Sequence, residues 1–166
     1  PQRGTICNMI AELGATTGIF PSDERTREWL VVQRRAEQWS ERRADPGAAY
    51  DELEVVKLDE LEPLIAKPSS PGNVVPVREV AGITVQQVCV GSSVNSGYED
   101  LAIVAEVLRD KQVHPDVFMT VTPGSKQILD TIADTGAYQA LIAAGARMLE
   151  PVCGPCVGMG QAPPTG

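Results

Sequence analysis

The sequence of 166 residues is short of positive charge and has no long apolar run. It contains 14 Lys and Arg residues against 22 Asp and Glu residues, and the net charge of −8 argues against a surface for nucleic acid or an anionic membrane. No apolar run approaches the roughly 20 residues that span a bilayer, and no N-terminal segment has the basic-then-apolar order of a secretory signal. We therefore expect a cytoplasmic protein with no nucleic-acid or membrane partner.

Cysteine is also scarce, and the spacing of the four cysteines does not suggest a small disulfide scaffold. Only Cys153 and Cys156 are close in sequence, separated by Gly-Pro. Such a pair can clamp one metal ion, supply two ligands of an iron–sulfur cluster, or form a redox disulfide. The motif alone does not choose among these, although the Gly- and Pro-rich residues that follow disfavour a thioredoxin site and a closed zinc site needs four ligands.

The first part of the chain predicts helices followed by one short strand. Apolar residues recur at helical spacing over 5–17 and 23–43, and Asp23 is placed to begin the second helix. The segment 53–58 predicts a strand, and the stretch 67–76, rich in Pro, Ser and Gly, predicts a linker.

Strands and helices alternate after the predicted linker. The predicted elements, in chain order, are a strand at 86–91, a helix at 97–111, a strand at 116–121, helices at 124–135 and 137–144, and a strand at 146–149. This alternation favours right-handed crossovers and an α/β fold with a parallel, helix-covered sheet. We expect residues 1–70 to be the helical C-terminal part of one α/β domain and residues 71–166 to be most of the next. Neither end closes a pattern, so we expect a fragment of a longer protein.

Polar residues mark two predicted strand-to-helix turns and one helix face. The turn at 91–96 lies at the carboxyl edge of the predicted sheet, where open α/β folds place their sites, but it also fits a simple capped turn. The turn at 122–125 fits either an anion site or ordinary helix capping. Asn8 and Glu12 are four residues apart on one helix face, which fits either a site or a hydrogen-bonded surface pair.

Taken together, four motifs in the same order resemble the aconitase and isopropylmalate isomerase family. They are TICNMIAELGATTGIFP at 5–21, VGSSVNSGYEDL at 90–101, TVTPGSKQI at 120–128 and CGPCVG at 153–158. The set spans nearly the whole chain, which makes it far more specific than any one motif. The end of the first motif resembles aconitase more than isopropylmalate isomerase. The resemblance implies an aconitase-like three-layer α/β domain.

The resemblance also implies a hydro-lyase that moves a hydroxyl between adjacent carbons of a small tri- or dicarboxylate through an alkene acid. Such enzymes hold a [4Fe–4S] cluster by three cysteines, and the open iron acts as a Lewis acid. Cys153 and Cys156 match two of these ligands. Glu12 matches an active-site acid, and Asn8 and Asn95 match residues that contact the substrate or cluster.

The sequence departs from the family pattern at the third ligand, because Ser93 stands where the motif has cysteine. A serine oxygen is a harder and less acidic ligand than a thiolate, so a cluster held this way should be labile. Cys89, four residues upstream, is an alternative ligand if the turn is rearranged.

A second departure concerns what the chain does not contain. The family's catalytic serine base and substrate-binding arginines belong to segments that this sequence does not match. We therefore predict that the isolated chain is inactive, and that it belongs to an aconitate hydratase-like enzyme interconverting citrate and isocitrate with the remaining domains of the parent chain. The alternatives are a homoaconitate or isopropylmalate isomerase, and a non-catalytic homologue that has lost the cluster.

Overall fold

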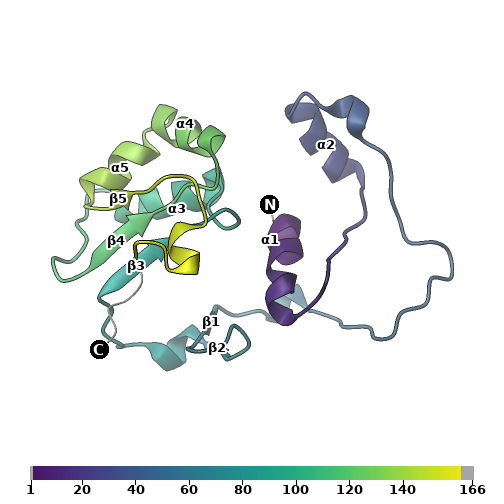
Figure 1. The fold of residues 1–166 in the computed structure, drawn as a ribbon, viewed down its shortest axis with the longest axis horizontal. Helices are drawn as coiled ribbons and strands as arrows, with labels where there is room; N and C mark the ends of the chain where they lie inside the picture. The colour runs from purple at the N-terminus through teal and green to yellow at the C-terminus, as the bar shows by residue number, and fades with distance from the viewer. Residues whose placement is uncertain (1, 162–166) are drawn as a thin grey trace. The chain divides into compact units, whose positions relative to one another are not determined.

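The computed structural model describes residues 2–161, which divide into two compact units (Figure 1). One unit is Ile6–Ala81, and the other runs from Gly82 to residue 161 and includes residues 2–5. Within residues 2–161, no helix is long and apolar enough to cross a membrane.

The unit that begins at Gly82 is built on a three-stranded parallel sheet in the order β3-β4-β5. Its elements are β3 (Gln87–Val90), α3 (Tyr98–Leu108), β4 (Phe118–Val121), α4 (Lys126–Asp134), α5 (Ala137–Ala143), β5 (Arg147–Met148) and the 3-10 turn η5 (Gly154–Val157). Helix α3 connects β3 to β4, and α4 and α5 connect β4 to β5. The predicted strands and helices are confirmed here, as is the α/β fold class with its parallel sheet.

Side-chain caps fix where two of these helices begin. The Asp100 carboxylate accepts a hydrogen bond from the Gly97 N–H at 3.0 Å at the start of α3. The Ser125 hydroxyl accepts one from the Ile128 N–H at 3.2 Å at the start of α4. Both bonds satisfy backbone donors that have no partner within the helix. The Ser125 bond shows that the second of the predicted strand-to-helix turns does cap its helix.

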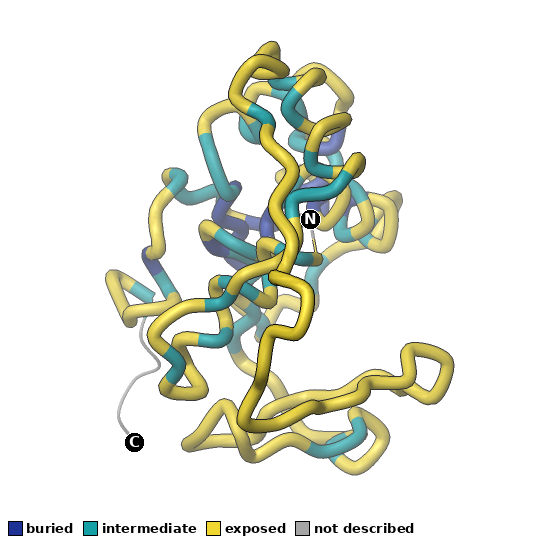
Figure 2. The backbone as a smooth tube through the Cα atoms, turned by 90° about the vertical axis from the view of Figure 1, so that its right-hand side faces the viewer, coloured by how far each residue is buried: buried dark blue, intermediate teal, exposed yellow. Residues whose placement is uncertain are grey.

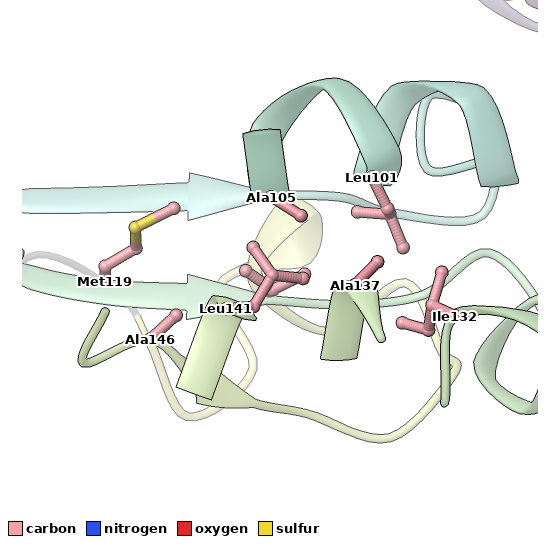
Figure 3. Packing of buried hydrophobic residues seen from close by; sticks show 8 residues of the cluster. Leu101, Ala105, Met119, Ile132, Ala137, Leu141 and Ala146 are labelled. Carbon is pink, nitrogen blue, oxygen red and sulfur yellow. The ribbon is translucent and has the colours of Figure 1, made fainter. Parts of the chain in front are cut away.

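The core of this unit lies between the sheet and its three helices (Figure 3). Its buried members are Leu101 and Ala105 of α3, Met119 and Val121 of β4, Ile132 of α4, Ala137 and Leu141 of α5, and Ala146. All three helices contact one another and share this one cluster, so they cover the same face of the sheet. Val88 and Val90 of β3 also pack against it, as expected for alternate residues of a strand.

The other face of the sheet carries the residues of β3 and β4 that alternate with the core-facing ones. Cys89 is in register with Thr120, and Thr120 and Thr122 are buried. Cys89, Thr122 and Pro155 line one cavity, so the η5 segment lies against this second face. The helices thus cover one face of the sheet, and the η5 segment covers part of the other, where Cys89 stays exposed.

The unit Ile6–Ala81 consists of short elements joined by long irregular segments. The end of helix α1 (Gln2–Met9), from Ile6 on, belongs to this unit and leads into η1 (Ile10–Leu13). Helix α2 (Glu24–Val32) is followed by η2 (Ala36–Gln38) and η3 (Leu58–Glu60). Strand β1 (Leu64–Ala66) pairs antiparallel with β2 (Val74–Pro76), and η4 (Val77–Val80) follows. No residue from 6 to 81 is buried (Figure 2).

Several predictions for this unit are wrong. The predicted helix over 5–17 ends at Leu13, because Gly14 adopts a left-handed conformation with φ 86°. Asp23 does cap α2, but the helix ends at Val32 and does not continue toward residue 43. Residues 53–58 form no strand.

The predicted linker is also a structured segment. Much of the stretch 67–76 turns β1 back onto β2, and the turn is closed by the Lys67 N–H, which donates to the Asn73 carbonyl at 2.8 Å. The Asn73 side-chain amide donates to the Pro68 carbonyl at 3.1 Å. Pro, Ser and Gly therefore mark a hairpin turn here.

Candidate metal centre

Two segments that are far apart in sequence bring two serines against two cysteines. The turn after β3 carries Ser92 and Ser93, Cys153 is the N-cap of η5, and Cys156 lies within η5. The Ser92 Oγ lies 3.1 Å from the Cys156 Sγ. The Ser93 Oγ lies 3.8 Å from the Cys153 Sγ. The three residues predicted from the motifs as metal ligands are therefore neighbours, together with Ser92, which no motif indicated.

The path of the serine turn depends on glycine. A Cβ at Gly91 would lie 2.8 Å from the Cβ of Thr122, closer than real side chains approach, and 3.1 Å from its carbonyl oxygen. A Cβ at Gly124 would lie 3.0 Å from the carbonyl oxygen of Ser96. The Gly124 N–H donates to that same carbonyl at 3.0 Å. The turns after β3 and β4 are thus packed directly on each other.

Hydrogen bonds also fix the cysteine segment. The Cys156 N–H donates to the Cys153 carbonyl at 3.0 Å, and the Gly158 N–H donates to the Pro155 carbonyl at the same distance. The Gln87 side-chain amide in β3 donates to the Gln161 carbonyl at 3.0 Å, which ties the segment to the sheet. Both cysteines are therefore presented from an ordered turn next to the carboxyl end of β3.

A cavity of about 120 Å³ adjoins Cys156. It is lined by Cys89, Val90, Gly91, Ser92, Thr122, Pro155 and Cys156. Ser92 is 8% exposed, whereas Ser93 and both cysteines of the motif are exposed. The Thr122 hydroxyl is buried and has no hydrogen-bond partner, and the same holds for the Ser96 hydroxyl. The cavity is large enough for water, which needs about 10–15 Å³, and it offers polar groups to it.

The other predicted site residues lie elsewhere on the described chain. Asn95 is exposed in the serine turn, and its Oδ1 accepts a hydrogen bond from the Thr5 hydroxyl at 2.9 Å. Asn8 lies in α1 and Glu12 in η1, and both are exposed. Their parts in the chemistry stay predictions.

The donor set decides which metal group this site suits. Within residues 2–161, no three His, Cys, Asp or Glu side chains are grouped closely enough to hold a metal ion, so Cys89 does not complete a three-thiolate set. Proteins hold iron–sulfur clusters mainly through cysteine thiolates. Cys153 and Cys156 can supply two thiolates to an iron–sulfur cluster. The third protein ligand would then be the oxygen of Ser93.

Comparison with known proteins defines the class of this chain. The sequence profile described as "Aconitase family (aconitate hydratase)" matches residues 1–82 and 78–166. The chain therefore belongs to the aconitase family.

The names of similar proteins are more specific than the description of the family profile. The 3-isopropylmalate dehydratase large subunit 1 of Methanopyrus kandleri is 44% identical over 157 residues, which cover 95% of this chain and 37% of that protein. Large subunit 2 of Rubrobacter xylanophilus is 42% identical over 158 residues, with the same two coverages. The probable methanogen homoaconitase large subunit of Methanothermobacter thermautotrophicus is 38% identical over 156 residues, or 94% of this chain and 36% of that protein. The chain spans little more than a third of the length of these relatives.

Proposed function

We propose that this chain is part of a cytoplasmic hydro-lyase that acts on a small hydroxy acid of the isopropylmalate or homoaconitate kind. The names of the similar large subunits support this substrate class. They support it better than the citrate and isocitrate predicted from the end of the first motif. The proposed partners are the carboxylate substrate and the remaining domains of the parent protein.

The observation that carries the proposal is the approach of Ser93 to Cys153 and of Ser92 to Cys156, at 3.8 and 3.1 Å. Cys153 and Cys156 would hold a [4Fe–4S] cluster, with the Ser93 oxygen as third ligand. When bound, such a cluster supplies a Lewis acid for a substrate hydroxyl. An alkoxide in place of one thiolate is expected to make it labile.

Three further residues have proposed roles in this chemistry. The Glu12 carboxylate would exchange a proton with the departing hydroxyl or with the water that adds to the alkene acid. The side-chain amides of Asn8 and Asn95 would donate hydrogen bonds to the substrate or to the cluster. We expect no turnover by the isolated chain, because the proposal assigns the serine base and the arginines that bind carboxylates to other parts of the parent.

One observation favours a second candidate, a non-catalytic homologue that has lost the cluster. Of the four free cysteines, Cys153 and Cys156 have sulfur atoms in contact with the hydroxyls of the serine turn. The position of the family's third cysteine ligand is occupied by Ser93. On this alternative, the two thiols and two hydroxyls are what is left of a former cluster site.

Anaerobic reconstitution with ferrous iron and sulfide tests the proposal. The chain, its Ser93→Cys variant and a Cys153→Ser/Cys156→Ser double variant would be compared by visible absorbance and by iron and sulfide per chain. We expect the chain to take up about four irons and the double variant none, because thiolates are the principal ligands. Uptake by Ser93→Cys alone would favour the non-catalytic homologue, and no uptake by either would overturn the proposal.

A further inference from the structure

Ser92 differs from its neighbour Ser93 in both burial and contact. Ser92 is 8% exposed and its Oγ lies 3.1 Å from the Cys156 Sγ. Ser93 is exposed and its Oγ lies 3.8 Å from the Cys153 Sγ. Of the two serine–cysteine contacts, the first is therefore shorter and better shielded from water.

The direction of this hydrogen bond follows from the chemistry of metal binding. A cysteine binds a metal ion as the thiolate, which carries no proton. In that state only the Ser92 hydroxyl can donate, so the bond runs from Ser92 to the Cys156 sulfur. Partners of this kind orient metal ligands, and their removal commonly costs 10–100-fold in metal affinity.

The backbone on both sides holds Ser92 in this position. Gly91 is packed against Thr122 so closely that a side chain would not fit, and the cysteine turn is closed by the Cys156 N–H bond to the Cys153 carbonyl. Neither segment needs to move for the two side chains to meet. The hydroxyl is thus preorganised toward the sulfur.

We propose that Ser92 is a positioning residue that fixes the Cys156 sulfur for metal binding. The identity of the metal group rests on the function proposed above. The action of Ser92 does not, because a hydrogen bond to a thiolate affects the binding of any thiol-seeking ion. The inference assigns unequal roles to the two serines, with Ser93 as a candidate ligand and Ser92 as its support.

Titration of the 166-residue chain with Cd²⁺ alone tests the role of Ser92, because this soft ion binds thiolates and no iron–sulfur cluster has to assemble first. The signal is the ultraviolet charge-transfer absorbance between thiolate and Cd²⁺. We expect Ser92→Ala to raise the Kd about 10–100-fold. Ser92→Thr keeps the hydroxyl at a residue that lines the adjoining cavity, so the Kd should return toward that of the unaltered chain.

The matched control is Ser96→Ala. It makes the same chemical change in the same turn, at a hydroxyl that is fully buried but has no partner. Its Kd should match that of the unaltered chain, and circular dichroism would confirm that all variants fold alike. An unchanged Kd in Ser92→Ala would overturn the proposal, as would a Ser92→Thr variant as weak as Ser92→Ala.

The two proposals fail in different experiments. If the unaltered chain assembles no iron–sulfur cluster but the Ser92 variants still differ in Cd²⁺ affinity, the proposed function fails and the role of Ser92 stands. If the unaltered chain does not bind Cd²⁺ at all, the role of Ser92 is overturned.

Discussion

Residues 82–161 and residues 6–81 both contain many large apolar side chains, but only the first unit buries some of them. Leu101, Ile132 and Leu141 are fully buried, whereas Leu13 is 74% exposed and Leu53 is 85% exposed. The difference lies in arrangement, because parallel strands and three mutually packed helices direct side chains to one cluster. Apolar content alone therefore does not make a core, and the unit that has one also carries both serine–cysteine contacts.

Local interactions do not compensate for the missing core in residues 6–81. Helix α2 has ion pairs between Arg27 and Glu24 at 2.8 Å and between Arg25 and Glu28 at 3.2 Å, all largely exposed. Pairs of this kind contribute about 0.3–0.5 kcal/mol each. Burial of a leucine side chain contributes about 1.5–3 kcal/mol. The free energy that holds the candidate metal centre together is thus concentrated in residues 82–161.

Truncation of a core leucine should have the largest effect on this contrast. Leu141→Ala removes a fully buried side chain from between α5 and the sheet, and should lower the free energy of unfolding of its unit by about 2–5 kcal/mol. The matched change Leu61→Ala, at a residue 58% exposed, should alter it by less than about 0.5 kcal/mol. Hydrogen exchange across a urea series measures this quantity for each variant in its own unit, at the β4 amides for Leu141→Ala and at the β1 and β2 amides for Leu61→Ala. Equal effects of the two variants would show that the exposed leucine is also part of a core.

A methyl group added at the serine turn should have the next largest effect. Gly91→Ala places a Cβ against Thr122, and relief of that overlap should cost about 1–3 kcal/mol. Gly72→Ala is the control in the other unit, because its nearest neighbour would be the Ser70 hydroxyl at an ordinary 3.6 Å. The same exchange measurement applies to Gly91→Ala, and we also expect it to weaken Cd²⁺ binding by displacing Ser92. Unchanged stability and Cd²⁺ binding would mean that the turn does not need glycine.

The sequence predicted the two units unequally, and for a physical reason. Between residues 82 and 161, alternating strands and amphipathic helices bury the faces that their periodicity marks, so pattern and structure agree. In the other unit, residues 53–58 have a strand-like pattern but no partner strand. The helix predicted over 23–43 ends at its C-cap Gln33. The next residue, Arg34, has φ 58°, a left-handed conformation that cannot continue a right-handed helix.

The candidate metal centre was predictable only in part. Motif resemblance selected Cys153, Cys156 and Ser93, which the structure places side by side. No motif indicated that Ser92 also meets a cysteine sulfur, because which hydroxyl meets which sulfur depends on how the turn crosses Thr122.

Loss of a helix cap is the smallest of these perturbations, and the two units offer matched sites for it. Ser125 caps α4 through the Ile128 N–H at 3.2 Å, and Asp23 caps α2 through the Thr26 N–H at 3.3 Å. Ser125→Ala should lower the free energy of unfolding of residues 82–161 by about 1 kcal/mol, because α4 contributes Ile132 to the core. Asp23→Ala should leave that value unchanged and speed exchange only in α2. Ser125→Asp retains an acceptor and should restore most of the loss, which separates the cap bond from a packing effect. If Asp23→Ala instead lowered the stability measured at β4, the two units would unfold together, and the contrast between them would not extend to their stability.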